Sequence, residues 1–504
     1  MGLELKKTAS LLFVLKVIKA PLSIITLSLT AKYFGVSLEK DVWLLAFSFV
    51  IMVDLAIWGP INETFRTKFV TIKESDSEVK ALEQTRSLLF YIFLGSLLIV
   101  GLIELFAPFV SKFIAPNFTE AESQILIKML RWVAPLLLVN QFMLLGNSIL
   151  NAYEIFYVPE IATFVSQLTN IIMLILLAPH IGIYSLLLST VLSTLFQIAF
   201  IIFYFQKLNI PLFKFQTFKW SDFWYFFIFA LPFFIPYFFG QINGVIEKSI
   251  ASTLGTGIVS TIDYARRVPD VISGVLISIV LTIVVPLLTK DFVRKDEDSF
   301  NANFISSFQL GLFLLVAFVS FMITGAPYVN TLLYGNRTIS QHSMSEIIEL
   351  SIYYAVTLIA IFLYILFGMC MMAIGKSRLY AGLGAVAQIV VIVLNVLLVK
   401  HFGIYIFPIS IFIAHFLSAI VMGHNYPYGK MLVVSEFVRY VLYGVALSLC
   451  VYYSFLFVIT ISIFDNIIIK LISIGIIQII FMILLGFLFK ISELFILFQK
   501  IKVR

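Results

Sequence analysis

The stretch Thr261-Ile-Asp-Tyr-Ala-Arg-Arg-Val-Pro-Asp270 places four charges inside an apolar run over about residues 258–288. Three of these charges follow the spacing i, i+4 and i+7, which puts them on one face of a helix. A charge at membrane depth is costly unless it faces protein or water, so such a face is a candidate functional site. An ion network that merely fixes helix packing is the alternative interpretation. We interpret all four charged residues as candidates for substrate binding: Asp263, Arg266, Arg267 and Asp270.

The composition predicts an all-α membrane protein that crosses the bilayer many times. The chain has 504 residues, of which 61% are hydrophobic and 12% charged, and its mean hydropathy is +1.06. Soluble chains are normally about one quarter charged. The net charge of +7 falls mostly in short loops, so we do not expect nucleic acid as a partner. Cys370 and Cys450 lie in separate apolar segments and form neither a disulfide framework nor a metal-ligand spacing.

Apolar runs of about 20 residues, long enough to span a bilayer, recur along the chain and predict about fourteen transmembrane helices. Pro232 and Pro236 can kink the seventh of these spans. The run that follows Lys6 and Lys7 has no signal cleavage site, so we expect it to be the first span. The spans begin near Ala9, Val42, Ser87, Ile125, Val158, Ile181, Phe223, Ile258, Phe304, Ile347, Leu379, Ile404, Phe437 and Ile467.

Lys and Arg residues gather in alternate connections between the expected spans. One such connection holds Arg66, Lys68, Lys73, Lys80 and Arg86. Positive residues concentrate in cytoplasmic loops. We therefore expect both termini to be cytoplasmic.

Three motifs recur after about 220 residues, which is the signature of an internal repeat. The pairs are Ala31-Lys-Tyr-Phe-Gly35 with Ala251-Ser-Thr-Leu-Gly255, Thr67-Lys68 with Thr289-Lys290, and His180-Ile-Gly-Ile-Tyr184 with His401-Phe-Gly-Ile-Tyr405. We predict two parallel six-helix repeats that form two lobes, residues 1–215 and 216–430, with the substrate path between them. Residues 431–489 are expected to form two extra C-terminal helices, and residues 490–504 a cytoplasmic interfacial tail. His180 and His401 both precede a glycine, so we predict a repeated turn there, not a metal site.

Three more charges lie inside the first two expected spans. Lys16 and Lys19 share a face of the first span, and Asp54 lies at a similar depth on the second. Neither Lys19 nor Asp54 is tolerable alone at that depth, so we predict that they form an ion pair or share a wet cavity. The alternative is that the Lys19 side chain snorkels toward the cytoplasm and Asp54 meets water independently. The sequence carries none of the common enzyme motifs, so we expect no catalysis and no bound cofactor.

Several motifs, taken in order, resemble the MurJ/MviN family of lipid II flippases. The resemblance runs from about residue 9 to 425 and includes Tyr264-Ala-Arg-Arg267 with Asp270 after it. Asp41 matches the acidic residue that this family has before its second helix. The other matching segments are Leu105-Phe-Ala-Pro-Phe-Val110, Ala115-Pro-Asn-Phe118, Ile149-Leu-Asn151 with Phe156 and Pro159, and Gln241-Ile242 leading into Ala251-Ser252.

The resemblance implies a flippase of the multidrug/oligosaccharidyl-lipid/polysaccharide exporter superfamily. Such proteins carry a polyprenyl-pyrophosphate-linked saccharide from the inner to the outer leaflet of the bacterial inner membrane by alternating access. The implied partners are this lipid and the surrounding membrane lipids, and we expect a monomer. Na⁺ or H⁺ is a possible coupling ion with no assigned site. The candidate substrate-binding residues outside the opening stretch are Lys16, Lys19, Asp41, Asp54 and Gln241.

One departure from the family pattern leaves the cargo open. Members of the family resemble one another in having arginines along helix one and inside helix two. The matching positions here are Ala20, Thr26 and Asp54. Lysine does not replace the bidentate fork of arginine toward pyrophosphate. A surface-polysaccharide repeat unit is therefore a cargo alternative to lipid II. A cation-coupled multidrug exporter of the same superfamily and a polymerase of lipid-linked sugars are the alternative functions.

Overall fold

A computed structural model describes residues 19–494, apart from residues 20, 213–216, 281–283, 336–337, 429 and 461–465. The described residues form helices and no strand, which confirms the predicted all-α class. Most of the first predicted span, the candidate residue Lys16 and most of the predicted tail lie outside the described residues.

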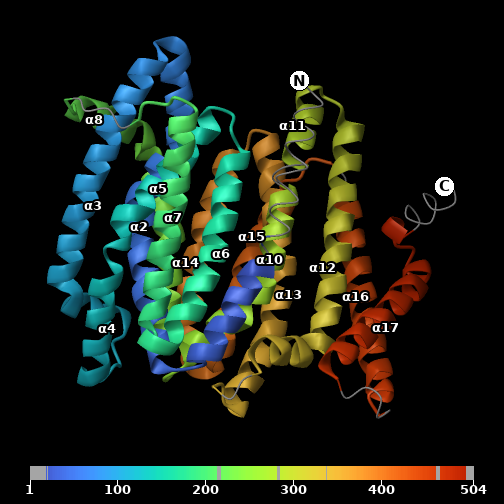
Figure 1. Ribbon diagram of the computed structural model, residues 1–504. Helices are drawn as coiled ribbons and strands as arrows, with labels where there is room; N and C mark the ends of the chain where they lie inside the picture. Colours follow the sequence, from blue (N-terminus) through green and yellow to red (C-terminus); the bar gives the residue numbers. More distant parts are fainter. Residues whose placement is uncertain are drawn as a thin grey trace. The chain divides into compact units, whose positions relative to one another are not determined.

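The chain divides into two compact units at Ser260 and Thr261. In Figure 1 the first unit runs from blue to green, and its α2, α3 and α5 pack against one another. A helix over residues 21–34 opens the described part of this unit. Its other elements are α2 (Leu38–Ser75), α3 (Glu78–Ile114), α4 (Glu120–Val133), α5 (Leu136–Ala152), α6 (Tyr157–Ile181), α7 (Tyr184–Lys207), α8 (Trp220–Ala230), η1 (Leu231–Phe233) and α9 (Phe234–Ser252).

The second unit holds the remaining helices and most of α10, whose first turn belongs to the first unit. In this unit α12 packs against α13, α16 and α17. The elements are α10 (Ile258–Ile279), α11 (Val285–Val293), α12 (Glu297–Tyr334), α13 (Gln341–Ala373), α14 (Ser377–Phe402), η3 (Gly403–Tyr405), α15 (Ile406–His424), α16 (Lys430–Val458) and α17 (Ile467–Leu488).

Long apolar helices confirm a protein with many spans. The described residues contain 10 helical stretches long and apolar enough to cross a membrane, or 11 when α8 and α9 count as one broken span. One of the ten stretches, Ser377–His424, combines two predicted spans. The 3-10 turn η1 interrupts the seventh predicted span at Pro232, as the proline pattern predicts.

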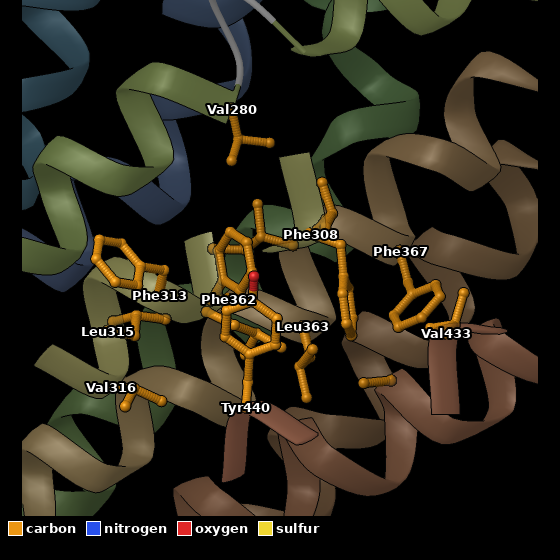
Figure 2. Close-up of a cluster of buried hydrophobic side chains, with 14 of the residues drawn as sticks. Val280, Phe308, Phe313, Leu315, Val316, Phe362, Leu363, Phe367, Val433 and Tyr440 are labelled. Atoms are coloured by element: carbon orange, nitrogen blue, oxygen red, sulfur yellow. The ribbon is translucent and has the colours of Figure 1, made fainter. Parts of the chain in front are cut away.

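Each unit buries its own hydrophobic core. In the first unit, Phe65 and Phe69 of α2 pack with residues of α3, α5, α7 and α8. In the second unit, side chains of α12, α13 and α16 interdigitate (Figure 2). Figure 2 labels Val280, Phe308, Phe313, Leu315, Val316, Phe362, Leu363, Phe367, Val433 and Tyr440. These cores hold the helices that carry the charged residues.

The predicted repeated turn is confirmed. Gly182 ends α6 with φ 56° and ψ −138°, and Gly403 ends α14 with φ 55° and ψ −135°. A positive φ favours glycine, which explains why both motifs carry it after the histidine. The repeat boundary at residues 215 and 216 stays a prediction, because the division into compact units concerns contacts and not sequence duplication.

Candidate functional site

The four charges of α10 form two intrahelical ion pairs. Arg267 Nη2 lies 2.8 Å from Asp263 Oδ1, and Arg266 Nε lies 3.3 Å from Asp270 Oδ2. Both pairs are four residues apart, the spacing at which side chains meet on a helix. The sequence pattern placed Asp263, Arg267 and Asp270 on one helix face and named no ion pair. In the structure Asp270 is the partner of Arg266.

The two pairs differ in which group is accessible. The Asp263 side chain is 8% exposed and that of Arg267 is 48% exposed. Arg266 and Asp270 are 32% and 50% exposed. The charged end of a half-exposed arginine side chain in a span must face water or a charged ligand, because lipid would leave it unsolvated. Arg267 is thus the accessible cation of its pair, and Asp263 is its buried counter-ion.

Aromatic residues of the second unit hold this part of α10 in place. The buried Tyr264 ring lies 5.1 Å from the Tyr334 ring, and the Tyr334 hydroxyl donates to the Tyr264 carbonyl oxygen at 3.3 Å. The Arg266 guanidinium carbon lies 5.6 Å from the centre of the Tyr354 ring, a cation–π distance. The α10 face is therefore fixed by packing on its opposite side.

The predicted pair of Lys19 and Asp54 is wrong. The Lys19 ammonium binds the carboxylate of Glu160, in the first turn of α6. Both side chains are partly buried, at 16% and 23% exposure. A carboxylate is favourable at a helix N-terminus, so α6 itself stabilises Glu160. Similar depth in the membrane fixes height but not direction, and Lys19 faces α6.

Asp54 has amide partners instead of a cation. Its carboxylate is fully buried and accepts hydrogen bonds from Asn140 Nδ2 and, at 2.6 Å, from Gln141 Nε2, both on α5. Gln141 Oε1 in turn accepts from Asn62 Nδ2 at 3.0 Å. A carboxylate enclosed in this way is not accessible to a bulky cargo in this conformation.

Asp41 joins the start of α2 to the start of α10. Its buried carboxylate accepts from the Gly257 N–H at 2.5 Å, and from the Ser260 N–H and hydroxyl at 2.7 and 2.5 Å. The first N–H groups of a helix lack intrahelical acceptors. Asp41 supplies acceptors for these N–H groups from a distant part of the sequence. Contact between Asp41 and the cargo stays a prediction.

Gln241 lies on α9 and is half-buried, and its contact with cargo stays a prediction. Sequence reasoning missed the partners Glu160, Asn140 and Gln141. Each is a polar residue inside an apolar run, which is the signal that could have revealed it. Among the described residues no cluster of three His, Cys, Asp or Glu side chains could hold a metal ion.

The accessible arginines are suited to an anion. A guanidinium binds phosphate through two parallel N–H donors, with more specificity than an ammonium. Arg267 presents such a group beside a buried counter-ion. A multiply charged phosphate ester could displace Asp263 from Arg267 without moving α10.

The chain is similar to a known protein family over most of its length. The model of the family described as lipid II flippase MurJ matches residues 30–475. A probable lipid II flippase MurJ of Buchnera aphidicola is 23% identical over 412 residues, 77% of each chain. The one of Aquifex aeolicus is 28% identical over 244 residues, and the match spans about half of each chain, 47%.

Solved structures share the fold. A lipid II flippase MurJ in an inward closed conformation superposes with a TM-score of 0.77 at 18% identity and covers 94% of this chain and 98% of its own. An inward-facing multidrug resistance transporter of the MATE family has a TM-score of 0.65 at 15% identity and covers 82% and 94%. At these identities the likeness concerns the fold alone.

Proposed function

We propose, from the premise that this chain belongs to the MurJ family of lipid II flippases, that it moves a polyprenyl-pyrophosphate-linked saccharide across the membrane. Lipid II is the cargo that the family favours. The observation that carries the proposal is the half-exposed side chain of Arg267 inside an apolar helix. A pyrophosphate is the part of the cargo that most needs such a cation in a low-dielectric setting.

The internal counter-ion explains how an empty site tolerates this charge. Asp263 neutralises Arg267 when no cargo is bound, and the pyrophosphate takes its place during transport. Lys19 and Glu160 form a second ion pair in the first unit, in which both side chains are partly buried. Exchange of one anion for another keeps Arg267 paired throughout, so the arginine itself is never an isolated charge.

One alternative is a cargo other than lipid II. Asp54 occupies a position where the resemblance places an arginine, and its carboxylate repels phosphate. A surface-polysaccharide repeat unit on the same carrier therefore remains the second candidate. We propose that the lipid moves from the inner to the outer leaflet of the bacterial inner membrane. Both termini are proposed to be cytoplasmic, as the distribution of Lys and Arg indicates.

Reconstitution tests this function. The full chain in proteoliposomes receives labelled lipid II in one leaflet, and a membrane-impermeant enzyme or quencher reports how much reaches the other leaflet. We expect protein-dependent exchange of lipid II. Parallel vesicles carry the same polyprenyl pyrophosphate with a non-murein oligosaccharide, and others a fluorescent organic cation. Exchange of the oligosaccharide lipid alone would identify the second cargo, and export of the organic cation alone would overturn the flippase function.

A further inference from the structure

Among the described residues, the carboxylate of Asp54 has only side-chain amides as hydrogen-bond partners. It is 0% exposed, and its hydrogen bonds come from the side-chain amides of Asn140 and Gln141. A buried charge is normally paired or bound to a metal, because desolvation is costly. Amide donors compensate for part of this cost and leave the charge itself unneutralised.

The ionisable groups on neighbouring helices have other partners. The helices α3, α4, α5, α8 and α9 pack against α2, and α5 has no ionisable residue. Lys80 binds Asp76, Arg86 binds backbone carbonyls, Arg131 binds Glu104, Lys128 lies over Tyr184, Asp222 accepts from Ser87, and Tyr237 donates to Glu63. Glu247 and Lys248 of α9 each have at least one interaction of their own. Within the described residues, Asp54 therefore has no cationic partner.

The amides around Asp54 form a chain with one direction. Asn62 Nδ2 donates to Gln141 Oε1 at 3.0 Å, and Gln141 Nε2 donates to Asp54 Oδ1 at 2.6 Å. Asn140 donates separately to Asp54 Oδ2. Every donor points toward the carboxylate, which is the arrangement that an ionised Asp54 requires.

The far end of this chain holds an unused acceptor. Asn62 Oδ1 is buried and has no hydrogen-bond partner among the described residues. When a proton binds Asp54 Oδ1, that oxygen becomes a donor. Rotation of the Gln141 amide then turns its Oε1 to Asp54 and its Nε2 to Asn62. Asn62 Oδ1 accepts this hydrogen bond after its own amide rotates, while Asn140 keeps its bond to Asp54 Oδ2.

We propose that Asp54 is a proton-binding site and that Gln141 and Asn62 reverse their hydrogen bonds when it is occupied. The step forms one O–H bond with a proton from water and breaks it again on release. A proton fits better than Na⁺, because a hard cation needs several oxygen ligands, whereas nitrogen donors surround this carboxylate. The coupling of this proton to transport rests on the proposed function.

The hydrogen-bond chain from Asp54 ends at Asn62, close to a proline of α2. Asn62 lies two residues after Pro60, which removes one backbone hydrogen bond from the helix. The next residue, Glu63, accepts from the Tyr237 hydroxyl of α9 at 2.9 Å. Reversal at Asn62 thus alters the hydrogen bonds next to the position where α2 bends most easily.

Infrared spectroscopy of the full chain in lipid nanodiscs tests proton binding directly. As the pH is lowered, we expect the C=O stretch of a protonated, buried carboxyl group to grow, together with shifts of side-chain amide bands. Asp54→Asn should abolish the carboxyl band. Asp291→Asn should retain it and serves as the matched control, because Asp291 is also buried and accepts from an amide, that of Asn303 at 2.7 Å.

Asn62→Leu tests the hydrogen-bond chain of Gln141 and Asn62 separately from proton binding at Asp54. It also keeps the proposal testable if Asp54→Asn fails to fold. We expect this variant to keep the carboxyl band and to lose the amide shifts. An identical carboxyl band in the wild type and Asp54→Asn, with both eluting as monodisperse protein, would overturn the site. Unchanged amide shifts in Asn62→Leu would overturn the reversal.

Proteoliposomes with an imposed pH gradient test the coupling. Wild-type lipid exchange should change with the sign of the gradient, whereas exchange by Asp54→Asn should not. Gradient-independent exchange by the wild type would overturn the coupling, even with the carboxyl band present. If the wild type exchanges no polyprenyl-pyrophosphate lipid at all, the proposed function fails, but the infrared result still decides whether Asp54 binds a proton.

Discussion

Arg267 and Asp263 form an ion pair one helical turn apart, with 2.8 Å between Nη2 and Oδ1, and the arginine is the exposed member. The helix backbone sets this separation, so the pair persists without support from a second helix. A buried acid beside an accessible base is an internal substitute for an anionic ligand. We therefore expect Arg267 to exchange Asp263 for a ligand anion.

Arg267→Ala should abolish lipid exchange while the protein reaches the membrane at normal level. A hydrogen bond to a charged group contributes roughly 1.5–3 kcal/mol, so affinity for a pyrophosphate lipid should fall about tenfold or more. Arg267→Lys should recover part of the loss, because it keeps the charge without the bidentate fork. Arg294→Ala, an exposed arginine outside the spans, is the control. Wild-type exchange by Arg267→Ala would favour a purely structural ion network.

A double-mutant cycle should show that Lys19 is coupled to Glu160 and not to Asp54. Lys19→Ala and Glu160→Ala should interact by about 0.5–3 kcal/mol in unfolding free energy, as contacting residues do. Lys19→Ala combined with Asp54→Asn should be additive within about 0.5 kcal/mol. Thermal unfolding of the purified variants in one detergent gives both numbers. Strong coupling between Lys19 and Asp54 would contradict the ion pair with Glu160.

Asp41→Ala should destabilise the first unit, because it leaves N–H groups of the α10 start without an acceptor. The loss of a capping side chain and the exposure of unsatisfied buried donors cost roughly 1–3 kcal/mol. Glu39→Ala is the matched control, since Glu39 is an exposed acid in the same first turn of α2. The melting temperature in detergent measures both. Equal effects of the two substitutions would remove the capping role.

Local sequence spacing accounts for what could be predicted of the site. Asp263 and Arg267 had to meet because four residues make about one turn of a helix. The glycines after His180 and His401 had to end helices because of their backbone freedom. Both features depend on a single segment.

The partners of Lys19 and Asp54 could not be predicted, because they depend on which way each helix faces in the packed structure. The depth of Lys19 and Asp54 followed from their positions in two spans, but the side of each helix that they occupy depends on packing. Glu160 lies 141 residues from Lys19, and Gln141 lies 87 residues from Asp54. No local rule selects such partners, although each is polar within an apolar run.

Gly257→Ala should destabilise the junction before α10 for two independent reasons. Gly257 has φ +90°, a conformation that alanine adopts with strain of about 1–3 kcal/mol. An added Cβ would also lie 2.5 Å from Val36 Cγ1, too close for any real contact. Because the Gly257 N–H donates to Asp41, the displaced backbone should also weaken that cap.

Two further variants separate strain from clash at this junction. Val36→Ala in the Gly257→Ala background should recover the part of the melting temperature that the clash costs, but not the part that the backbone strain costs. Gly240→Ala is the control, because Gly240 lies within α9, its added Cβ meets nothing within 4 Å, and alanine is favoured over glycine in a helix by roughly 0.5–1 kcal/mol. We therefore expect Gly240→Ala to raise the melting temperature or leave it unchanged. A Gly257→Ala protein as stable as Gly240→Ala would show that the chain around Gly257 adopts a different backbone conformation.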